Sequence, residues 1–200
     1  MDIIGLCGGS GSGKGAVASV MRTLGIPIID ADAVYHDIVS REGECTREIS
    51  HHFGEEVLTA DGALSRAALS EKIFTDADPT SRLAVLNSIT HKYVIARMRE
   101  LAGEYAKSGE SLAVYDAPLL FEAGIDKECT YIISVLCDKN IRTERIMARD
   151  GISRLEAEGR IAAQHTDEWL ASHSDFVIVN EGSESELASA VSEILEKIRK

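Results

Sequence analysis

The residues with the clearest chemical meaning form a glycine-rich loop near the start of the chain. Gly8, Gly13 and Lys14 fit the pattern GxxxxGK, between an apolar run and a helical pattern. Glycines let the backbone turn successive N–H groups toward phosphate oxygens, the helix N-terminus adds partial positive charge, and the lysine reaches the outer phosphates. We therefore predict a phosphate-binding loop made of Gly8, Gly9, Ser10, Gly11, Ser12, Gly13, Lys14, Gly15 and Ala16.

The loop departs from the usual pattern at one point. A serine or threonine normally follows the lysine and gives its hydroxyl to Mg²⁺, but here Gly15 and Ala16 follow Lys14. A water, or Ser12 inside the loop, could replace that hydroxyl. The sequence thus weakens the prediction of magnesium at one ligand.

Two other interpretations of the glycines are open. Gly13 to Ala18 also fits GxGxxA, and Asp30 ends the next apolar run, which together suggest dinucleotide binding. That motif would begin too late after the strand, and Lys14 would be out of place in it. A purely structural glycine loop is the other alternative. We favour the phosphate loop over both.

Carboxylates follow two other predicted strands. Asp30 and Asp32 lie at the end of the second strand, where ligands of open α/β sheets bind, and one of them could accept a proton from an attacking hydroxyl. Either of the two could instead be the N-cap of the next helix. Asp116 ends the apolar run 112–116 and resembles the acidic residue that holds Mg²⁺ or its waters in phosphate-loop enzymes.

A basic segment lies within the acidic chain, from Lys139 to Arg160. Arg142, Arg145 and Arg149 are three and four residues apart, so they share one helix face. Such a face could close over transferring phosphates and neutralise their charge. The alternative is a solvated face balanced by local salt bridges.

The pattern of elements explains how these residues could be positioned. Apolar runs at 2–7, 27–29, 112–116, 131–136 and 176–179 predict strands, and helical patterns fill most of the gaps. Strand–helix alternation predicts a parallel sheet covered by helices on both faces. The stretch from about 34 to 107 is nearly all helical and includes one long amphipathic helix after Asp78. Capping boxes start later helices at Ser153 and Ser183, and the last helix runs to Lys200.

Composition excludes several classes of protein. The 200 residues are 44% hydrophobic and 27% charged, with a formal net charge of -12, which fits a folded globular chain and disfavours a general nucleic-acid binder. No apolar run approaches membrane-spanning length, and the first residues lack the basic region of a secretory signal. The four cysteines have no CxxC spacing, which favours free thiols in a reducing cytoplasm.

Taken together, the motifs resemble those of the dephospho-coenzyme A kinases over nearly the whole chain. The resemblance rests on the phosphate loop, on Asp30-Ala31-Asp32 with His36, and on segments 53–54, 61–66, 73–74, 86–91, 116–122, 145–150, 160–164 and 180–182. Three departures stand out: Gly15-Ala16, Lys92 where the family usually has proline, and Arg142 where it usually has glutamine. We expect the last two to alter packing or charge without changing the reaction.

The resemblance implies an activity: ATP would phosphorylate the 3′-hydroxyl of dephospho-CoA, the last step of coenzyme A synthesis. Asp32 would be the catalytic base, and Lys14, Arg145 and Arg149 would stabilise the transferring phosphoryl group. Asp116 would position Mg²⁺, partly through water, and lie near the acceptor, while Asn180 would lie near the adenine. The expected dephospho-CoA contacts are Asp32, His36, Arg66, His91, Asp116 and Leu119.

The resemblance also implies the organisation of the chain. We expect one domain with the three-layer α/β fold of P-loop nucleoside triphosphate hydrolase-like kinases. Its core would span about 1–32, 108–138 and 166–200, with a helical CoA-binding insert at about 33–107 and a helical lid at about 139–165. We expect a cytoplasmic monomer or weak homo-oligomer that binds neither nucleic acid nor membrane. A weakened paralogue that binds nucleotide or CoA precursors, or another small-molecule kinase, are the alternatives.

Overall fold

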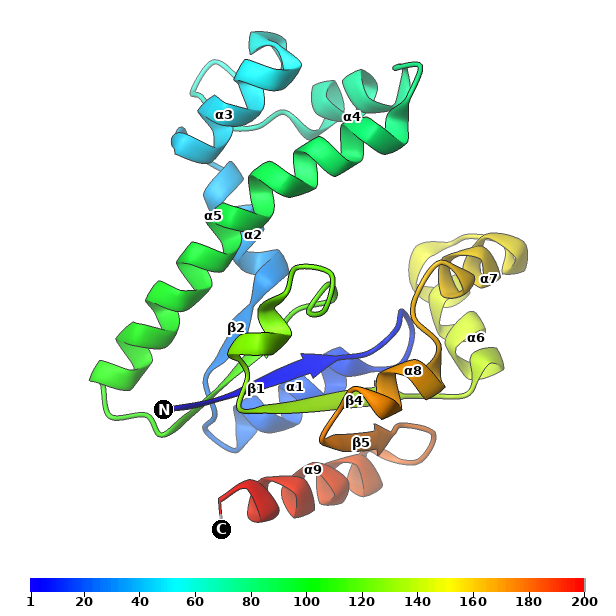
Figure 1. Ribbon diagram of the computed structural model, residues 1–200. Helices are drawn as coiled ribbons and strands as arrows, with labels where there is room; N and C mark the ends of the chain where they lie inside the picture. Colours follow the sequence, from blue (N-terminus) through cyan, green and yellow to red (C-terminus); the bar gives the residue numbers. More distant parts are fainter. Residues whose placement is uncertain (200) are drawn as a thin grey trace. The chain divides into compact units, whose positions relative to one another are not determined.

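The computed structural model describes residues 1–199 and contains one five-stranded sheet (Figure 1). The strands stand in the order β2-β3-β1-β4-β5, and β1 pairs in parallel with β3 and β4, as β4 does with β5. Their bounds are β1 Asp2–Cys7, β2 Ile28–Asp30, β3 Leu112–Asp116, β4 Tyr131–Leu136 and β5 Phe176–Val179. Helices lie on both sides of the sheet, so the predicted three-layer α/β class is confirmed.

The helices follow the predicted periodicities closely. The long amphipathic helix is α5, and Asp78 caps it by accepting the Ser81 N–H at 3.1 Å. Both predicted capping boxes form, at Ser153 and Ser183, while the predicted end of the last helix at Lys200 lies outside the described residues. The bounds are α1 Lys14–Thr23, α2 Ala31–Val39, α3 Glu44–Phe53, η1 Glu55–Val57, α4 Arg66–Phe74, α5 Pro79–Lys107, η2 Ile125–Glu128, α6 Lys139–Asp150, α7 Arg154–Ala162, α8 Asp167–Ser172 and α9 Glu184–Ile198.

The chain divides into two compact units. Met1–Ile29 and Tyr105–Lys200 form the first, which we call the sheet unit, and Asp30–Glu104 form the second, which we call the helical unit. Each unit has a hydrophobic cluster of its own. The helical unit is the stretch between the second and third strands of the sheet.

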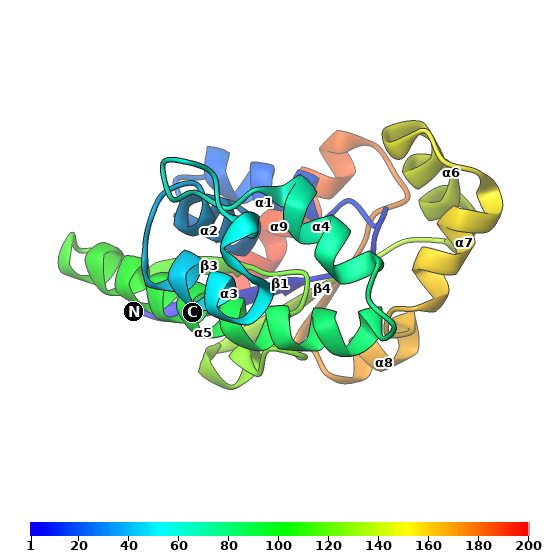
Figure 2. The same ribbon diagram turned by 90° about the horizontal axis from the view of Figure 1, so that it is seen from above.

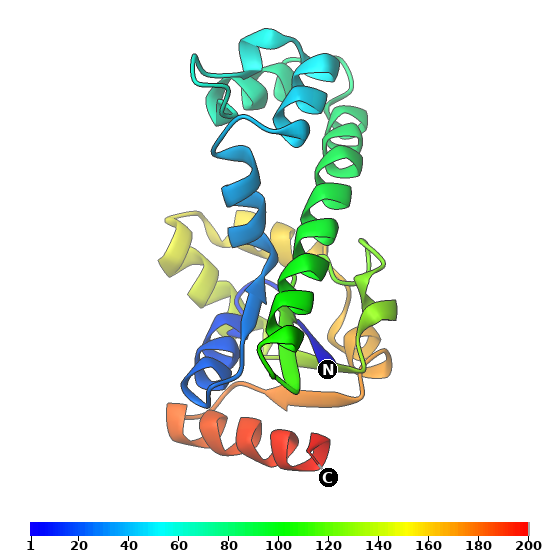
Figure 3. The same ribbon diagram turned by 90° about the vertical axis from the view of Figure 1, so that its left-hand side faces the viewer.

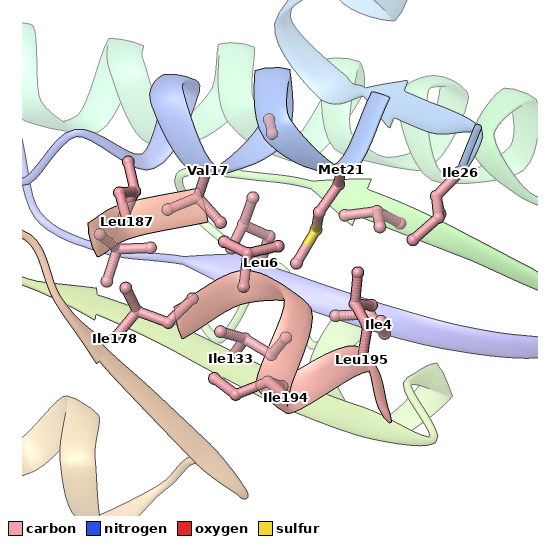
Figure 4. Close-up of a cluster of buried hydrophobic side chains, with 14 of the residues drawn as sticks. Ile4, Leu6, Val17, Met21, Ile26, Ile133, Ile178, Leu187, Ile194 and Leu195 are labelled. Atoms are coloured by element: carbon pink, nitrogen blue, oxygen red, sulfur yellow. The ribbon is translucent and has the colours of Figure 1, made fainter. Parts of the chain in front are cut away.

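One face of the sheet is covered by α1 and α9. Side chains of β1 and β4, such as Leu6 and Ile133, meet Val17 and Met21 of α1 and Ile194 of α9 in a dry cluster (Figure 4). All five are under 1% exposed except Ile194, at 7%. Burying side chains of this size contributes roughly 1.5–3 kcal/mol each, so this cluster holds the N-terminal strand and helix rigidly on either side of the glycine loop.

The other face of the sheet carries α8 and the segment that follows β3. Ser134 of β4 bonds to Ser174 at 2.5 Å, beyond the end of α8. At Gly5 a Cβ would stand 2.8 Å from Cys129 Sγ and from Leu120, so this strand position must be glycine for the segment to approach. Figure 2 shows α6, α7 and α8 at one end of the sheet unit, and Figure 3 shows α9 running beside β5.

The helical unit is built around α3, α4 and part of α5. Buried side chains from each of them, among them Ile49, Leu69 and Ile89, form its cluster. Glu48 of α3 accepts hydrogen bonds from both Lys92, at 2.6 Å, and the Tyr93 hydroxyl, at 2.7 Å, which ties α3 to α5. Lys92, one of the departures noted above, thus makes a local ion pair on this unit. No helix among residues 1–199 is long and apolar enough to cross a membrane.

Candidate active site

The glycine loop turns between β1 and α1, and its carbonyl oxygens are held from outside. Asn180 Nδ2 donates to Ser12 O at 2.8 Å, and Arg145 donates to Gly11 O and Ser12 O at 3.3 and 3.4 Å. Arg142 Nε donates to Ser10 O at 3.0 Å. Because the carbonyls of a tight loop and its N–H groups point to opposite sides, these contacts orient the N–H groups toward the hollow of the loop.

The N–H groups on the inner side are available for an anion. Within the described residues, those of Gly11, Gly13, Lys14 and Gly15 make no hydrogen bond to protein. Two of them belong to the first turn of α1, where the helix dipole adds partial positive charge. N–H groups without protein partners at a glycine-rich helix N-terminus are suited to bind phosphate.

The loop needs glycine at position 13. Gly13 caps α1 in the left-handed region, with φ of 91°, which side-chain-bearing residues adopt at a cost. A Cβ there would also overlap the Asn180 amide group. Asn180 itself is 7% exposed and lies where β5 ends, since its N–H bonds to Leu136 O at 2.9 Å. The structure therefore gives Asn180 a contact that sequence reasoning did not foresee: it holds the loop.

Lys14 and Asp116 form an ion pair between Nζ and Oδ1. The parallel register explains their approach, because Asp116 stands opposite Leu6, just before the loop. Both side chains are largely buried, at 18% and 9% exposure. In such a site the charge-assisted bond is strong, and it holds the ammonium at the end of β3.

The three arginines of α6 differ from the predicted shared face. Arg149 is exposed, and its guanidinium lies 3.4 Å from Ser10 Oγ while pairing with Asp150 at 2.7 Å. Arg145 is half-buried against the loop carbonyls. Arg142 is buried at 3% exposure, so the hypothesis that it faces the phosphates is wrong: its nitrogens bond to protein. The spacing of the three arginines along α6 shows that they share a helix face. It could not show that Arg142 is the one buried against the segment that leads from α7 into α8.

Two carboxylates lie where β2 meets α2, and only one of them is the helix cap. Asp30 is the N-cap of α2, and its Oδ1 accepts the N–H groups of Asp32 and Ala33 at 2.9 and 3.0 Å. Asp32 stands in the first turn of α2 and is exposed, with His36 four residues later on the same helix face. The structure thus settles which of the two is the cap and leaves the Asp32 carboxylate outside that role. Both belong to the helical unit.

The remaining predicted substrate residues are spread over both units. Arg66 begins α4. Burial raises the pKa of Tyr35 on α2, and the positive charge of Arg66 partly offsets that rise. His91 is half-buried on α5. Leu119, at 44% exposure, is in the sheet unit beyond β3. A hollow of about 550 Å³ in the helical unit is lined by Ile38 of α2 and by residues at the start of α3 and on α5, and none of His36, Arg66 or His91 lines it.

The residues beside the loop suit a magnesium ion carried by nucleotide phosphates. Mg²⁺ commonly keeps several waters and takes one or two carboxylates plus substrate phosphates. Asp116 would supply one carboxylate, and the described residues contain no cluster of three acidic, histidine or cysteine side chains that would form a closed cage. The Ser12 hydroxyl is buried and has no hydrogen-bond partner among the described residues, so it is a candidate for the missing loop hydroxyl.

Comparison with known proteins assigns the chain to a family. The model of the dephospho-CoA kinase family matches residues 2–186. The chain belongs to the dephospho-CoA kinase family. A dephospho-CoA kinase of Anaeromyxobacter dehalogenans is 39% identical over 100% of this chain and 93% of its own length, and one of Geobacter sulfurreducens is 40% identical over 98% of each. The solved structure of the Thermus thermophilus protein TT1252 covers 98% of this chain and 97% of its own, with 32% identity and a TM-score of 0.77.

Membership of the dephospho-CoA kinase family confirms several predictions. The resemblance was correct, and the protein is a kinase with a P-loop nucleotide-binding fold. Full-length similarity covers the glycine loop, the helical unit and α6 to α8 alike, rather than the loop alone. The dinucleotide interpretation of the glycines is accordingly wrong.

Proposed function

We propose that the protein transfers the γ-phosphoryl group of ATP to the 3′-hydroxyl of dephospho-CoA, giving CoA and ADP. The observation that carries the proposal is the loop itself: among the described residues, four N–H groups at and just before the start of α1 make no hydrogen bond to protein, beside the Lys14–Asp116 pair. Family membership over the full chain supports dephospho-CoA as the acceptor.

The proposed transfer follows from the roles of the side chains. The ribose O3′ attacks the γ-phosphorus, the bond from that phosphorus to the β–γ bridging oxygen breaks, and ADP leaves. Asp32 takes the proton of the hydroxyl, since its carboxylate is exposed in the first turn of α2 while Asp30 serves as the cap. Such a base contributes about 10²–10⁴ in rate.

The cationic side chains stabilise charge that grows on the phosphoryl oxygens. Lys14 reaches outward from the loop, and Arg149 lies at its rim near Ser10. Arg145 acts through the loop carbonyls that it binds. Asp116, together with water, would hold a magnesium ion, which would neutralise phosphate charge. We propose Asn180 as an adenine neighbour, and His36, Arg66, His91 and Leu119 as contacts to dephospho-CoA.

The helical unit is proposed to bind dephospho-CoA, and α6 to α7 to act as the lid. The 6 cationic and 4 acidic side chains between Lys139 and Arg160 support a lid that meets polyphosphate, given the chain's net charge of -12. We also propose a cytoplasmic location, in keeping with four cysteines that form no disulfide, and a monomer or weak homo-oligomer.

The deciding experiment measures ADP release from ATP and Mg²⁺ with dephospho-CoA, adenosine and AMP as separate acceptors. We expect turnover when dephospho-CoA is the acceptor, and none with adenosine or AMP. Turnover with another acceptor in its place would identify a different small-molecule kinase. Saturable ATP binding without any turnover would identify the weakened paralogue, and Gly15→Ser would then show whether the missing hydroxyl is the cause.

A further inference from the structure

Arg142 is a buried cation that the proposed reaction does not use. Its side chain is only 4% exposed, although it lies on α6 in the same turns as the arginines that face the loop. Nε donates to Ser10 O at 3.0 Å, one terminal nitrogen donates to Asp167 Oδ1 at 3.1 Å, and the other donates to Gln164 Oε1 at 3.2 Å. A buried charge is retained at a cost unless each donor finds a partner, and here the partners come from two segments, the glycine loop and the segment that leads from α7 into α8.

The contacts close a ring around one residue of the glycine loop. Gln164 Oε1 also accepts the backbone N–H of Ser10, at 2.8 Å. Both backbone polar groups of Ser10 are thus occupied: its carbonyl by Arg142 and its N–H by Gln164, which Arg142 itself holds. The Ser10 N–H belongs to the peptide unit before Ser10, and its carbonyl belongs to the peptide unit after it. Because both groups are hydrogen-bonded, the ring fixes the orientation of the two peptide units and so of the loop at Ser10.

The ring lies on the outer side of the loop. At Gly9 a Cβ would overlap the Arg142 guanidinium, and at Gly11 a Cβ would stand 2.7 Å from the main-chain oxygen of Arg142. The guanidinium therefore rests against the loop backbone, with its donors directed to protein acceptors rather than to phosphate. Gln164 lies between α7 and α8, and Asp167 begins α8, so the ring also joins the loop to these two helices.

We propose that Arg142 is a positioning residue for the phosphate donor: with Gln164 and Asp167 it holds Ser10 so that the following N–H groups face the phosphates of ATP. The gain is preorganisation, because the loop does not have to be ordered when the nucleotide binds. This inference rests on the proposed use of ATP by the loop. It predicts that loss of Arg142 weakens ATP binding selectively and leaves the acceptor site as it was.

The test compares Arg142→Gln, Arg142→Lys and Gln164→Leu with the wild type. Arg142→Gln should raise the Kd and KM for ATP about 10-fold, the effect of losing a hydrogen bond to a charged group, while KM for dephospho-CoA stays within about twofold. Arg142→Lys should recover part of the affinity, because an ammonium can reach Ser10 O but cannot bridge three acceptors in a plane. Arg22→Gln, an exposed arginine at the end of α1, is the matched control and should change neither constant.

Thermal unfolding separates positioning from simple destabilisation. If Arg142→Gln lowers Tm while the Kd for ATP is unchanged, or if both KM values rise together, the inference is wrong. Should Arg142→Gln fail to fold, Gln164→Leu decides: the side chain is at the surface, and its loss frees the Ser10 N–H and must still weaken ATP binding about threefold or more. The double variant should lose less affinity than the sum of the two, since both act through Ser10.

ATP binding measured by calorimetry without acceptor keeps this inference distinct from the proposed function. A wild type that binds ATP but does not turn over dephospho-CoA would remove the function and leave the Arg142 comparison valid. A wild type that turns over, with an Arg142→Gln variant that binds ATP normally, would overturn the positioning role alone.

Discussion

Lys14 and Asp116 are joined by an ion pair from Nζ to Oδ1, although 102 residues separate them in the chain. The pair brings the cation of the glycine loop and the proposed magnesium carboxylate to one point at the end of the sheet. Each residue therefore sets the charge that its partner experiences, and neither can be removed without leaving a largely buried charge behind.

Loss of either member of this pair should impair the reaction in a different way. Lys14→Met should lower kcat by about 10²–10³, the usual cost of removing a charge that stabilises the transition state. Asp116→Asn should lower kcat and raise the Mg²⁺ concentration needed for half-maximal rate. Steady-state rates over a magnesium titration measure both.

The control for the lysine is Lys197→Met, in the last turn of α9. It should leave the rates unchanged. A Lys14→Met enzyme with more than a third of wild-type kcat would show that the loop works without its cation, and would remove Lys14 from the catalytic set.

Asp32 and Asp30 allow a matched test of the catalytic base. Asp32→Asn should lower kcat more than tenfold with the Kd for ATP nearly unchanged, because only the proton acceptor is lost. Asp30→Ala removes the cap of α2 instead and should cost about 1 kcal/mol of folding stability. Rates and urea unfolding of both variants should show opposite patterns, and an Asp32→Asn enzyme with normal kcat would mean that another group takes the proton.

A hydroxyl can be restored at position 15 without strain. A Cβ on Gly15 would meet no atom of the described residues within 4 Å. The helix propensity of serine is also more favourable than that of glycine, by about 0.5 kcal/mol. Gly15→Ser should therefore fold normally and lower the Mg²⁺ concentration at half-maximal rate. Gly15→Ala, which gains the helix propensity without the hydroxyl, is the control. An identical magnesium response in the two variants would show that water already supplies the missing ligand fully.

Gly13 and Asn180 should be the most sensitive positions of the loop. Gly13→Ala places a side chain in the left-handed region and against the Asn180 amide, so ATP binding should be lost. Asn180→Ala removes the bond to Ser12 O and should weaken ATP binding about five- to tenfold, as expected for one buried hydrogen bond. Calorimetric titration with ATP measures both. Normal affinity in Asn180→Ala would show that Arg145 alone is enough to orient Ser12.

The thiols should be unreactive in the folded protein. Burial raises the pKa of Cys129 to about 12 and that of Cys45 to about 11, with nearby carboxylates adding to both shifts. Burial also raises the pKa of Cys7 and of Cys137. Since the thiolate is the reactive form, iodoacetamide at pH 8 should label the urea-unfolded chain quickly and the native chain very slowly. Rapid labelling of any one cysteine in the native state would contradict this.

The same shifts predict alkaline destabilisation. Below the ordinary thiol pKa of 9.0 both states keep the proton, and the full stability is present. As the pH rises from 9 toward 11, the unfolded chain ionises while the folded chain does not, so stability falls. The urea concentration at which half of the protein is unfolded should fall less between pH 8 and pH 10 in Cys129→Ala than in the wild type. An equal loss would place the alkaline sensitivity in other groups.

Much of the site could be predicted from the sequence because its determinants are local. A loop between an apolar strand and a helix, with glycines and one lysine at fixed spacing, specifies its own backbone over a few residues. The central strands were recognisable because they are buried on both faces and are therefore almost continuously apolar, as β3 shows. The edge strand β5 is also an apolar run, although Val177 and Val179 are exposed in the structure. The long helix α5 was recognisable from its repeating apolar stripe and its Asp78 cap.

Only the tertiary structure decided which of several equivalent side chains does what. Asp30 and Asp32 carry the same carboxyl group two residues apart. Asp30 is the N-cap because it is the residue that ends β2, directly before the first turn of α2. Arg142, Arg145 and Arg149 share a helix face in the sequence pattern. In the structure Arg142 is buried and donates hydrogen bonds to Ser10 O and to Asp167 of α8, whereas Arg149 stays exposed near Ser10 Oγ. Local spacing determines which side chains share a face, whereas burial and hydrogen-bond partners depend on segments distant in the chain, and so they arise only when the chain folds.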